Sequence, residues 1–146
     1  MTHATPRPRD RILVVDDDAP TRKALGLLLS DDYEVVVTAG PREALLQLER
    51  KEFCILITDE QMPDGSGLEL LAEVDRRFPL VIGILMTGRG DLPGVRAAMR
   101  NVRGATVLLK PCDGDLLLQK VQNAATMARM RRATHRLSSS RSLRPR

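Results

Sequence analysis

The chain alternates between short apolar runs and longer segments in which apolar residues recur with helical spacing. The predominantly apolar runs occupy residues 11–15, 34–37, 54–58, 80–86 and 106–109. Between them, apolar residues lie three or four positions apart, as Leu25, Leu28 and Leu29 do. Short aliphatic and β-branched runs without polar alternation are typical of parallel strands buried on both faces. The pattern therefore predicts five strands, each followed by a helix.

Turn and cap residues place the helix ends. Asp18 and Pro41 are expected to begin the first two helices, since a polar cap and an early proline both favour a helix start. Residues 59–67 are expected to form a loop before the third helix. Asp91 is expected to cap a short fourth helix, and Asp113 to begin the fifth. This strict alternation predicts an α/β fold with a single parallel sheet and helices on both faces.

Composition narrows the class of protein. The 146 residues include no Trp, one Tyr and two Phe, so the core must be aliphatic and base-stacking surfaces for nucleic acid are not expected. No run approaches the roughly 18 apolar residues that a membrane span needs, and the first residues do not resemble a secretory signal. Cys54 and Cys112 lack metal-binding spacing, which favours unpaired thiols in the cytoplasm.

Charge divides the chain into two regions. Residues 129–146 contain seven arginines and no acid, which leaves 16 basic against 19 acidic residues before them, a net charge of −3. We therefore expect a mobile segment at 1–10, one domain at 11–128 and a basic Arg/Ser-rich tail or linker at 129–146. A solvated or disordered end is the favoured form of the tail. Extension of the last helix into a homodimer contact is the second, and salt-sensitive, nonspecific nucleic-acid binding the third.

Two adjacent carboxylates, Asp16 and Asp17, follow the first strand directly. Neighbouring carboxylates raise each other's proton affinity unless a cation compensates them. Mg²⁺ suits such a pair, because one or two carboxylates, water and a phosphate oxygen complete its octahedron. The alternative interpretation, an acidic first turn with a helix cap, explains Asp18 alone.

Further polar groups end the other strands of the predicted sheet. Asp59 follows the third strand, where it is either a turn residue or a third oxygen ligand and a nucleophile toward phosphorus. Lys110 ends the fifth strand, and a compact ammonium there suits a phosphoryl oxygen. Thr87 and the backbone N–H of Gly88, after the fourth strand, are candidates to bind the same group. Functional groups gather at the carboxyl ends of parallel strands, so these residues are expected to converge.

Over residues 10–128, four stretches together resemble the receiver domain of bacterial two-component response regulators. They are Ile12-Leu-Val-Val-Asp-Asp-Asp, Ile57-Thr-Asp-Glu-Gln-Met-Pro-Asp-Gly-Ser-Gly, Met86-Thr-Gly and Leu109-Lys-Pro. The resemblance implies a flavodoxin-like (βα)5 fold, a three-layer sandwich whose parallel five-stranded sheet has the strand order 2-1-3-4-5. It also implies a phosphoacceptor switch rather than an enzyme, with slow self-dephosphorylation.

The resemblance assigns a role to each site residue. Asp59 would accept a phosphoryl group from a histidine kinase or a phosphotransfer protein. Mg²⁺ would be held by Asp17 and Asp59, by Asp16 mainly through water, and by the backbone carbonyl of Gln61. Lys110, Thr87 and Gly88 would bind the phosphoryl group, and the peptide bond before Pro111 would be cis. Gln61 and Arg89 lie where the family tunes the lifetime of the phosphorylated state.

Two positions depart from the family pattern. Val107 stands where the family usually has the Tyr or Phe that turns inward on activation, and Cys112 replaces a common Phe. A phosphorylation-independent adaptor is therefore an alternative function. A phosphohydrolase acting through an aspartyl-phosphate is less favoured, because such enzymes usually carry Asp-x-Asp after the first strand. The downstream partner, or a covalently linked output domain, is not identified by the sequence.

Overall fold

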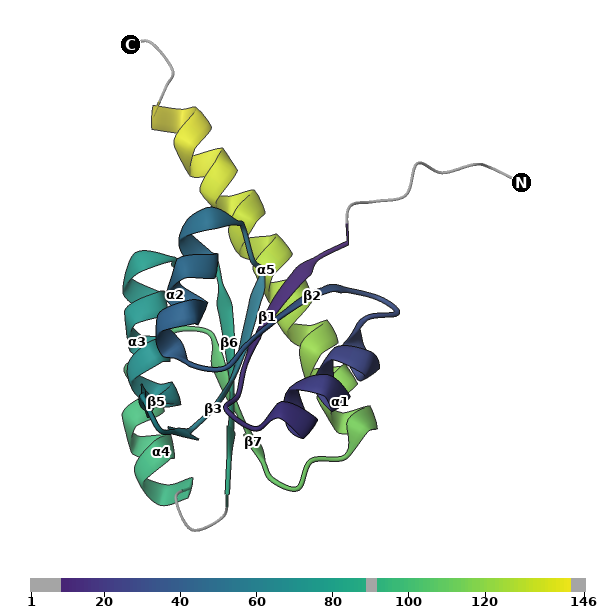
Figure 1. The fold of residues 1–146 in the computed structure, drawn as a ribbon. Helices are drawn as coiled ribbons and strands as arrows, with labels where there is room; N and C mark the ends of the chain where they lie inside the picture. The colour runs from purple at the N-terminus through teal and green to yellow at the C-terminus, as the bar shows by residue number, and fades with distance from the viewer. Residues whose placement is uncertain (1–8, 89–91, 143–146) are drawn as a thin grey trace, which may run out of the picture.

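The computed structural model describes residues 9–88 and 92–142 of the chain, and in it five parallel strands form one sheet (Figure 1). The strand order is β2-β1-β3-β6-β7. Numbering the five strands along the chain gives 2-1-3-4-5, which confirms the predicted fold class. The strands are β1 (Arg11–Val15), β2 (Glu34–Thr38), β3 (Ile55–Asp59), β6 (Ile82–Thr87) and β7 (Ala105–Leu109).

Helices cover both faces of this sheet, so the molecule has three layers. Figure 1 shows α2, α3 and α4 on one face and α1 and α5 on the other. Asp18 caps the first helix as predicted, because its side chain accepts a hydrogen bond from the backbone N–H of Thr21. The helices are α1 (Ala19–Leu29), α2 (Pro41–Arg50), α3 (Gly67–Arg77), α4 (Leu92–Met99) and α5 (Gly114–Ser142). Asp91, the predicted cap of α4, lies outside the described residues.

Alternate residues of each strand supply two separate hydrophobic cores. Ile12 and Val14 of β1 pack with α1 and α5, whereas Leu13 and Val15 pack with α2, α3 and α4. All four side chains are almost completely buried. Because successive side chains of a strand point to opposite faces, a strand buried on both sides must be apolar throughout. This explains why the strands lack polar alternation.

The segment between β3 and α3 is more ordered than the predicted loop. It contains a small antiparallel hairpin, β4 (Gln61–Met62) and β5 (Gly65–Ser66). A two-residue connection turns the chain, and Gly65 adopts a φ of 150°, which favours glycine. Strands of two residues are too short to produce a detectable alternation, so the prediction of a loop over residues 59–67 was wrong here.

The last helix also differs from the sequence prediction. We expected the helical pattern to dissolve near residue 127 into a solvated or disordered end, but α5 continues to Ser142. The second interpretation, an extension of the last helix, therefore describes the secondary structure of residues 129–142 correctly. The domain boundary placed at residue 128 stays a prediction.

Candidate functional site

The carboxylates of Asp16, Asp17 and Asp59 converge at the carboxyl end of the sheet. One oxygen from each residue lies within 4.8 Å of the others. The register explains this convergence, since Val15 of β1 pairs with Thr58 of β3 and an aspartate comes next in each segment. Asp16 directly follows β1, and Asp59 is the last residue of β3. Three carboxylates this close match the hard oxygen ligands that Mg²⁺ prefers.

Asp16 is the most deeply placed of the three carboxylates. It is 2% exposed, and its Oδ1 accepts a hydrogen bond of 2.9 Å from the backbone N–H of Asp18. Burial raises the pKa of Asp16 above its ordinary value, and the nearby Asp59 carboxylate adds to this rise. Asp18 behaves differently, because hydrogen bonds from Thr21 lower its pKa. A buried carboxylate with raised proton affinity gains most from a nearby cation.

Lys110 reaches the same cluster from β7. Its Nζ lies 2.8 Å from Oδ1 of Asp59, and the Asp59 side chain is only 14% exposed. The backbone N–H of Lys110 donates to the carbonyl of Thr87, which fixes the start of the following loop. The Lys110–Pro111 peptide bond is cis, as the sequence resemblance implies. The site therefore places one ammonium directly against the central carboxylate.

Thr87 is the last residue of β6, the strand next to β3, and Gly88 follows it. Asp59 pairs with Met86 in the sheet, so Thr87 is one residue further along the neighbouring strand. Thr87 is 1% exposed, and its hydroxyl donates a long, weak hydrogen bond of 3.5 Å to the carbonyl of Gly88. A hydroxyl held this weakly is available to a better acceptor. Arg89, the other residue predicted in this loop, lies outside the described residues.

A family comparison agrees with this geometry. Residues 12–122 match the family model of the response regulator receiver domain. The chain belongs to this family. Receiver domains are regulatory switches of two-component systems and not enzymes in the ordinary sense, and this receiver domain has a cluster of three aspartates at the carboxyl end of its sheet.

Individual relatives support the same assignment. The receiver domain is 36% identical over 115 residues to the transcriptional regulatory protein GlrR of Escherichia coli, covering 77% of this chain and 26% of GlrR. It is 37% identical over 113 residues to FixJ of Azorhizobium caulinodans, covering 75% of this chain and 52% of FixJ. The chain thus spans about a quarter to a half of the length of these relatives.

A solved structure matches most of the fold. The signal receiver domain of an HD domain-containing protein from Pseudomonas fluorescens superposes with a TM-score of 0.81 at 28% identity. The match covers 91% of this chain and 98% of the other. Within the residues that our structure describes, no helix combines the length and the apolar character that crossing a bilayer requires.

Two predicted residues occupy more peripheral positions in this receiver domain. Val107 lies in β7 opposite Leu85, where it is partly buried and packs against the core shared with α4. Gln61 lies in β4, two residues after Asp59, and pairs with Ser66 of the hairpin. The hairpin therefore sets the path of the backbone on leaving Asp59.

Sequence reasoning missed the role of Gly67 in supporting Asp59. A Cβ at Gly67 would overlap the carbonyl oxygen of Asp59 and crowd Leu85. The backbone N–H of Gly67 also donates to the carbonyl of Glu60, and the Glu60 carboxylate accepts from the N–H of Leu68. The first turn of α3 is thus packed directly against the backbone that carries Asp59. The Gly-Ser-Gly segment indicated a loop, but a close approach of this kind cannot be recognised from composition.

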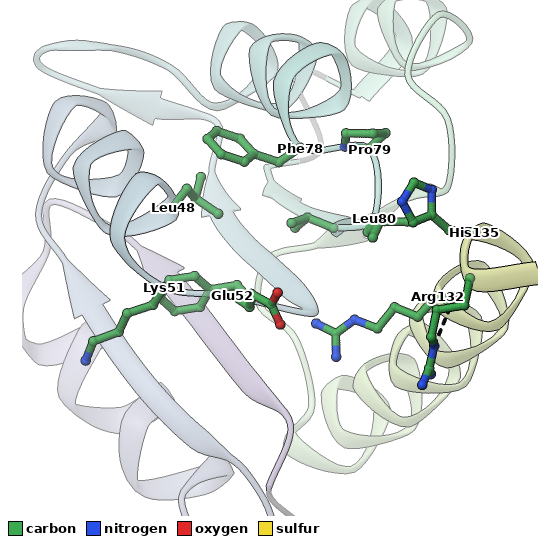
Figure 2. A pocket seen from close by; sticks show the side chains of 11 residues that line it. Leu48, Lys51, Glu52, Phe78, Pro79, Leu80, Arg132 and His135 are labelled. Carbon is green, nitrogen blue, oxygen red and sulfur yellow. Dashed lines mark hydrogen bonds between the residues drawn. The ribbon is translucent and has the colours of Figure 1, made fainter. Parts of the chain in front are cut away.

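A hollow of about 650 Å³ lies at the opposite, amino end of the sheet. Figure 2 shows Leu48 and Phe78 on one side of it, with Arg132 and His135 approaching from α5. Apolar side chains line it together with basic residues and the acidic Glu52, and none of the predicted site residues is among them. The lining residues are Leu48, Lys51, Glu52, Phe53, Phe78, Pro79, Leu80, Val81, Arg132, His135 and Arg136.

Proposed function

We propose that Asp59 accepts a phosphoryl group from the phosphohistidine of a sensor kinase or a phosphotransfer protein. The observation that carries this proposal is the position of the Asp59 carboxylate, which contacts the Lys110 ammonium and lies beside two further carboxylates. An oxygen of Asp59 would form the new bond to phosphorus, while the bond from phosphorus to the histidine nitrogen breaks. The product is an acyl phosphate on the chain and a free imidazole on the donor.

Asp16, Asp17 and Asp59 are proposed to hold Mg²⁺ together with the backbone carbonyl of Gln61. The close approach of the three carboxylates and the burial of Asp16 support this donor set. The ion would offset their repulsion and neutralise charge on the incoming phosphoryl group. Asp16 would act mainly through water, whereas Asp17, which is exposed, would contact the ion directly.

Lys110, Thr87 and Gly88 are proposed to bind the phosphoryl group after transfer. Lys110 would exchange its contact with the Asp59 carboxylate for one with a phosphoryl oxygen, which keeps its charge paired. The weakly bonded hydroxyl of Thr87 would turn toward the same group, and the N–H of Gly88 would donate to it. Gln61 and Arg89 would govern access of water to the acyl phosphate and so the rate of slow self-dephosphorylation.

Phosphorylation is proposed to change the surface that a downstream partner binds. Such a switch shifts the populations of two conformations of the domain. Phosphoryl transfer would take place in the cytoplasm. Cys54 and Cys112 are free thiols in the structure, and thiols stay unpaired in that compartment. The partner is either a separate protein or a further part of a longer chain, since the relatives extend well beyond the matched region.

One observation favours a second candidate function, binding without phosphorylation. Val107 supplies an aliphatic side chain where the family usually has a switching aromatic ring, and it packs into the core near α4. A side chain fixed in this way offers no ring to turn inward. In this alternative the receiver domain binds its partner constitutively, and the acidic pocket has no role in signalling.

The test is intact-mass spectrometry after incubation with Mg²⁺ and acetyl phosphate. We expect a gain of about 80 Da, the mass added by one phosphoryl group on an aspartate. The gain should require Mg²⁺ and disappear in Asp59→Asn, whereas Asp64→Asn, which alters an exposed aspartate of the hairpin turn, should retain it. Absence of the gain, while a control receiver is modified under the same conditions, would favour the constitutive adaptor.

A further inference from the structure

The hollow at the amino end of the sheet is a cavity that the proposed phosphorylation does not use. Its volume of about 650 Å³ lies within the range of about 300–1,000 Å³ that is typical of sites for small molecules. Three segments far apart in the sequence form its walls: the end of α2 with the residues before β3, the loop between α3 and β6, and α5. Figure 2 shows side chains from these segments facing a common space. The hollow is therefore a candidate binding site in its own right.

The apolar wall of the hollow contains both phenylalanines of the chain. Phe53 is 2% exposed, whereas Phe78 is only partly buried. Leu48, which is almost fully buried, lies beside them. In a sequence with no Trp and one Tyr, this concentrates aromatic surface at one place. A partly exposed ring next to buried aliphatic side chains suits the apolar part of a ligand.

The loop that closes one side of the hollow is held in place by hydrogen bonds. The backbone N–H of Val81 donates to the carbonyl of Phe78 at 3.0 Å. Arg131 of α5 donates to the carbonyl of Pro79, also at 3.0 Å. A Cβ at Gly104 would overlap the Arg131 guanidinium, so this side chain is packed closely on the residue before β7 as well. Walls fixed in this way lose little conformational freedom when a ligand binds.

Positive charge predominates around the hollow. Among the described residues that line it, Lys51, Arg132 and Arg136 are cationic, and Glu52 is the acidic one. His135 adds an imidazole at the same side as the arginines. Within the part of the chain that the structure describes, no ion pair joins Glu52 to any of the three cations. An anionic group would therefore meet positive charge that is not already neutralised.

Arg132 is the best placed of these cations to hold an anion. It is partly buried, whereas Lys51 and Arg136 are exposed. Figure 2 shows its side chain reaching from α5 into the hollow. Across residues 9–88 and 92–142, its guanidinium has no hydrogen-bond partner and no ion pair. A guanidinium presents two parallel N–H donors that match the two oxygens of a carboxylate. The structure thus offers a carboxylate a partner beside an apolar wall.

We propose that the hollow binds a small monocarboxylate with an apolar body. The carboxylate would pair with Arg132, while the apolar body packs against Phe78 and Leu48. Lys51 and Arg136 would add attraction from the mouth of the hollow, because both are exposed. None of these residues belongs to the aspartate cluster at the other end of the sheet, so binding does not depend on the proposed phosphorylation.

A titration of the full chain followed by ¹H–¹⁵N NMR tests this site with two probes. Phenylbutanoate and phenylbutanol share a ring and a short chain, and only the first carries a negative charge. We expect phenylbutanoate to bind at least about tenfold more tightly, because a hydrogen bond to a charged group is stronger than one between neutral groups. The amide signals of residues 78–81 should move. Equal affinity for the two probes, no binding of phenylbutanoate at millimolar concentrations, or signal changes confined to other regions would overturn the proposal.

Substitutions separate the charged part of the site from its apolar part. Arg132→Gln should weaken binding of phenylbutanoate by about tenfold and leave phenylbutanol unaffected, because it removes the charge and keeps a side chain of similar length. Arg42→Gln, at an exposed arginine outside the hollow, is the matched control and should change neither affinity. Leu80→Ala should weaken both probes, since it removes apolar surface from the wall. Equal loss in Arg132→Gln and Arg42→Gln would contradict the assignment.

The phosphoacceptor variant keeps this test independent of the proposed function. Asp59→Asn should bind phenylbutanoate as the unmodified chain does, because the carboxyl end of the sheet does not line the hollow. A failure of phosphorylation would thus leave the binding result in place, and a failure of binding would leave the phosphorylation result in place. Loss of phenylbutanoate binding in Asp59→Asn would show that the probe binds at the aspartate cluster instead.

Discussion

The two ends of the parallel sheet are built from the same strands and yet carry opposite chemistry. At the carboxyl end, charged side chains from separate strands converge, and Lys110 pairs with Asp59 at 2.8 Å. At the amino end, Lys51 and Arg132 are among the residues that line a hollow. Among the described residues, neither of these two cations lies within ion-pair distance of a carboxylate.

The two ends differ in how their charged groups are held. At the carboxyl end, burial raises the pKa of Asp16. The ammonium of Lys110 also lies in direct contact with the Asp59 carboxylate. A polar group held in a fixed, partly buried position can act on a reacting group without first reorganising. At the amino end Lys51 is exposed, so its charge is screened by solvent and salt. Three substitutions sharpen this contrast.

The largest effect is expected when one lysine at each end of the sheet is replaced by glutamine. Lys110→Gln removes the ammonium that contacts Asp59, and phosphoryl uptake from acetyl phosphate should slow by roughly 10²-fold, as when a preorganised charge is lost. Lys51→Gln makes the same change at the amino end and should leave the rate unaltered. Time courses by intact mass measure both rates. Equal effects of the two substitutions would contradict the assignment of the carboxyl end as the reactive one.

The next effect concerns the backbone that supports the carboxyl end. Gly67→Ala introduces a Cβ that overlaps the Asp59 carbonyl, so the free energy of unfolding should fall by roughly 1–3 kcal/mol, as in an overpacked core. Gly94→Ala in α4 is the control, because nothing lies within 4 Å of its added Cβ. It should raise the free energy of unfolding by up to about 1 kcal/mol through helix propensity. Urea unfolding distinguishes them, and stabilisation by Gly67→Ala would disprove the close contact.

The smallest effect is electrostatic and depends on pH and Mg²⁺. Because burial raises the pKa of Asp16 above 3.8, the folded protein binds more protons than the unfolded chain between 3.8 and the raised value. Stability contributed by this group therefore falls as pH rises through that window, and stays lowered at neutral pH. Asp16→Asn should raise the melting temperature in EDTA at pH 7, by about 3 °C for each kcal/mol relieved.

Two controls accompany this substitution. Mg²⁺ should raise the melting temperature of the unmodified protein but have little effect on Asp16→Asn, which lacks one carboxylate of the cluster. Asp31→Asn, at an exposed aspartate, should change neither value. The higher melting temperature of Asp16→Asn in EDTA should disappear as the pH falls below about 3.8, since Asp16 is then protonated in both the folded and the unfolded protein. An advantage that persists there would show that its origin is not electrostatic.

Much of the carboxyl end was predictable because strand ends are visible in the sequence. The aliphatic runs before Asp16, Asp59 and Lys110 fix where each strand stops, and parallel strands bring their ends together. The hydrophobic pattern could not show that Asp16 is buried and Asp17 exposed. Neighbouring residues point in different directions, and only the packing around them decides which is desolvated. The direct contact of Lys110 with Asp59 likewise required the structure.

The less predictable features depend on contacts distant in sequence or on very short elements. The β4–β5 hairpin has two residues per strand, too few for a period to be recognised. The continuation of α5 was only the second interpretation of the sequence, because the face packed on the sheet ends at Ala128 and the arginines that follow resemble a disordered tail. The exposed Met130 and Leu137 lie on a different face of the same helix from the buried Ala128. The helical spacing of apolar residues that the sequence reveals therefore described α5 only as far as Ala128.

The length of α5 has a mechanical consequence. The helix begins at Gly114, four residues after Lys110, and ends at Ser142. At 1.5 Å per residue its 29 residues form a rod of about 44 Å. A tilt of about 5° at the base of such a rod displaces its far tip by about 4 Å, by the geometry of a straight helix. A tilt of the whole helix on the sheet would therefore turn a small movement beside Lys110 into a displacement as wide as a side chain at its far end.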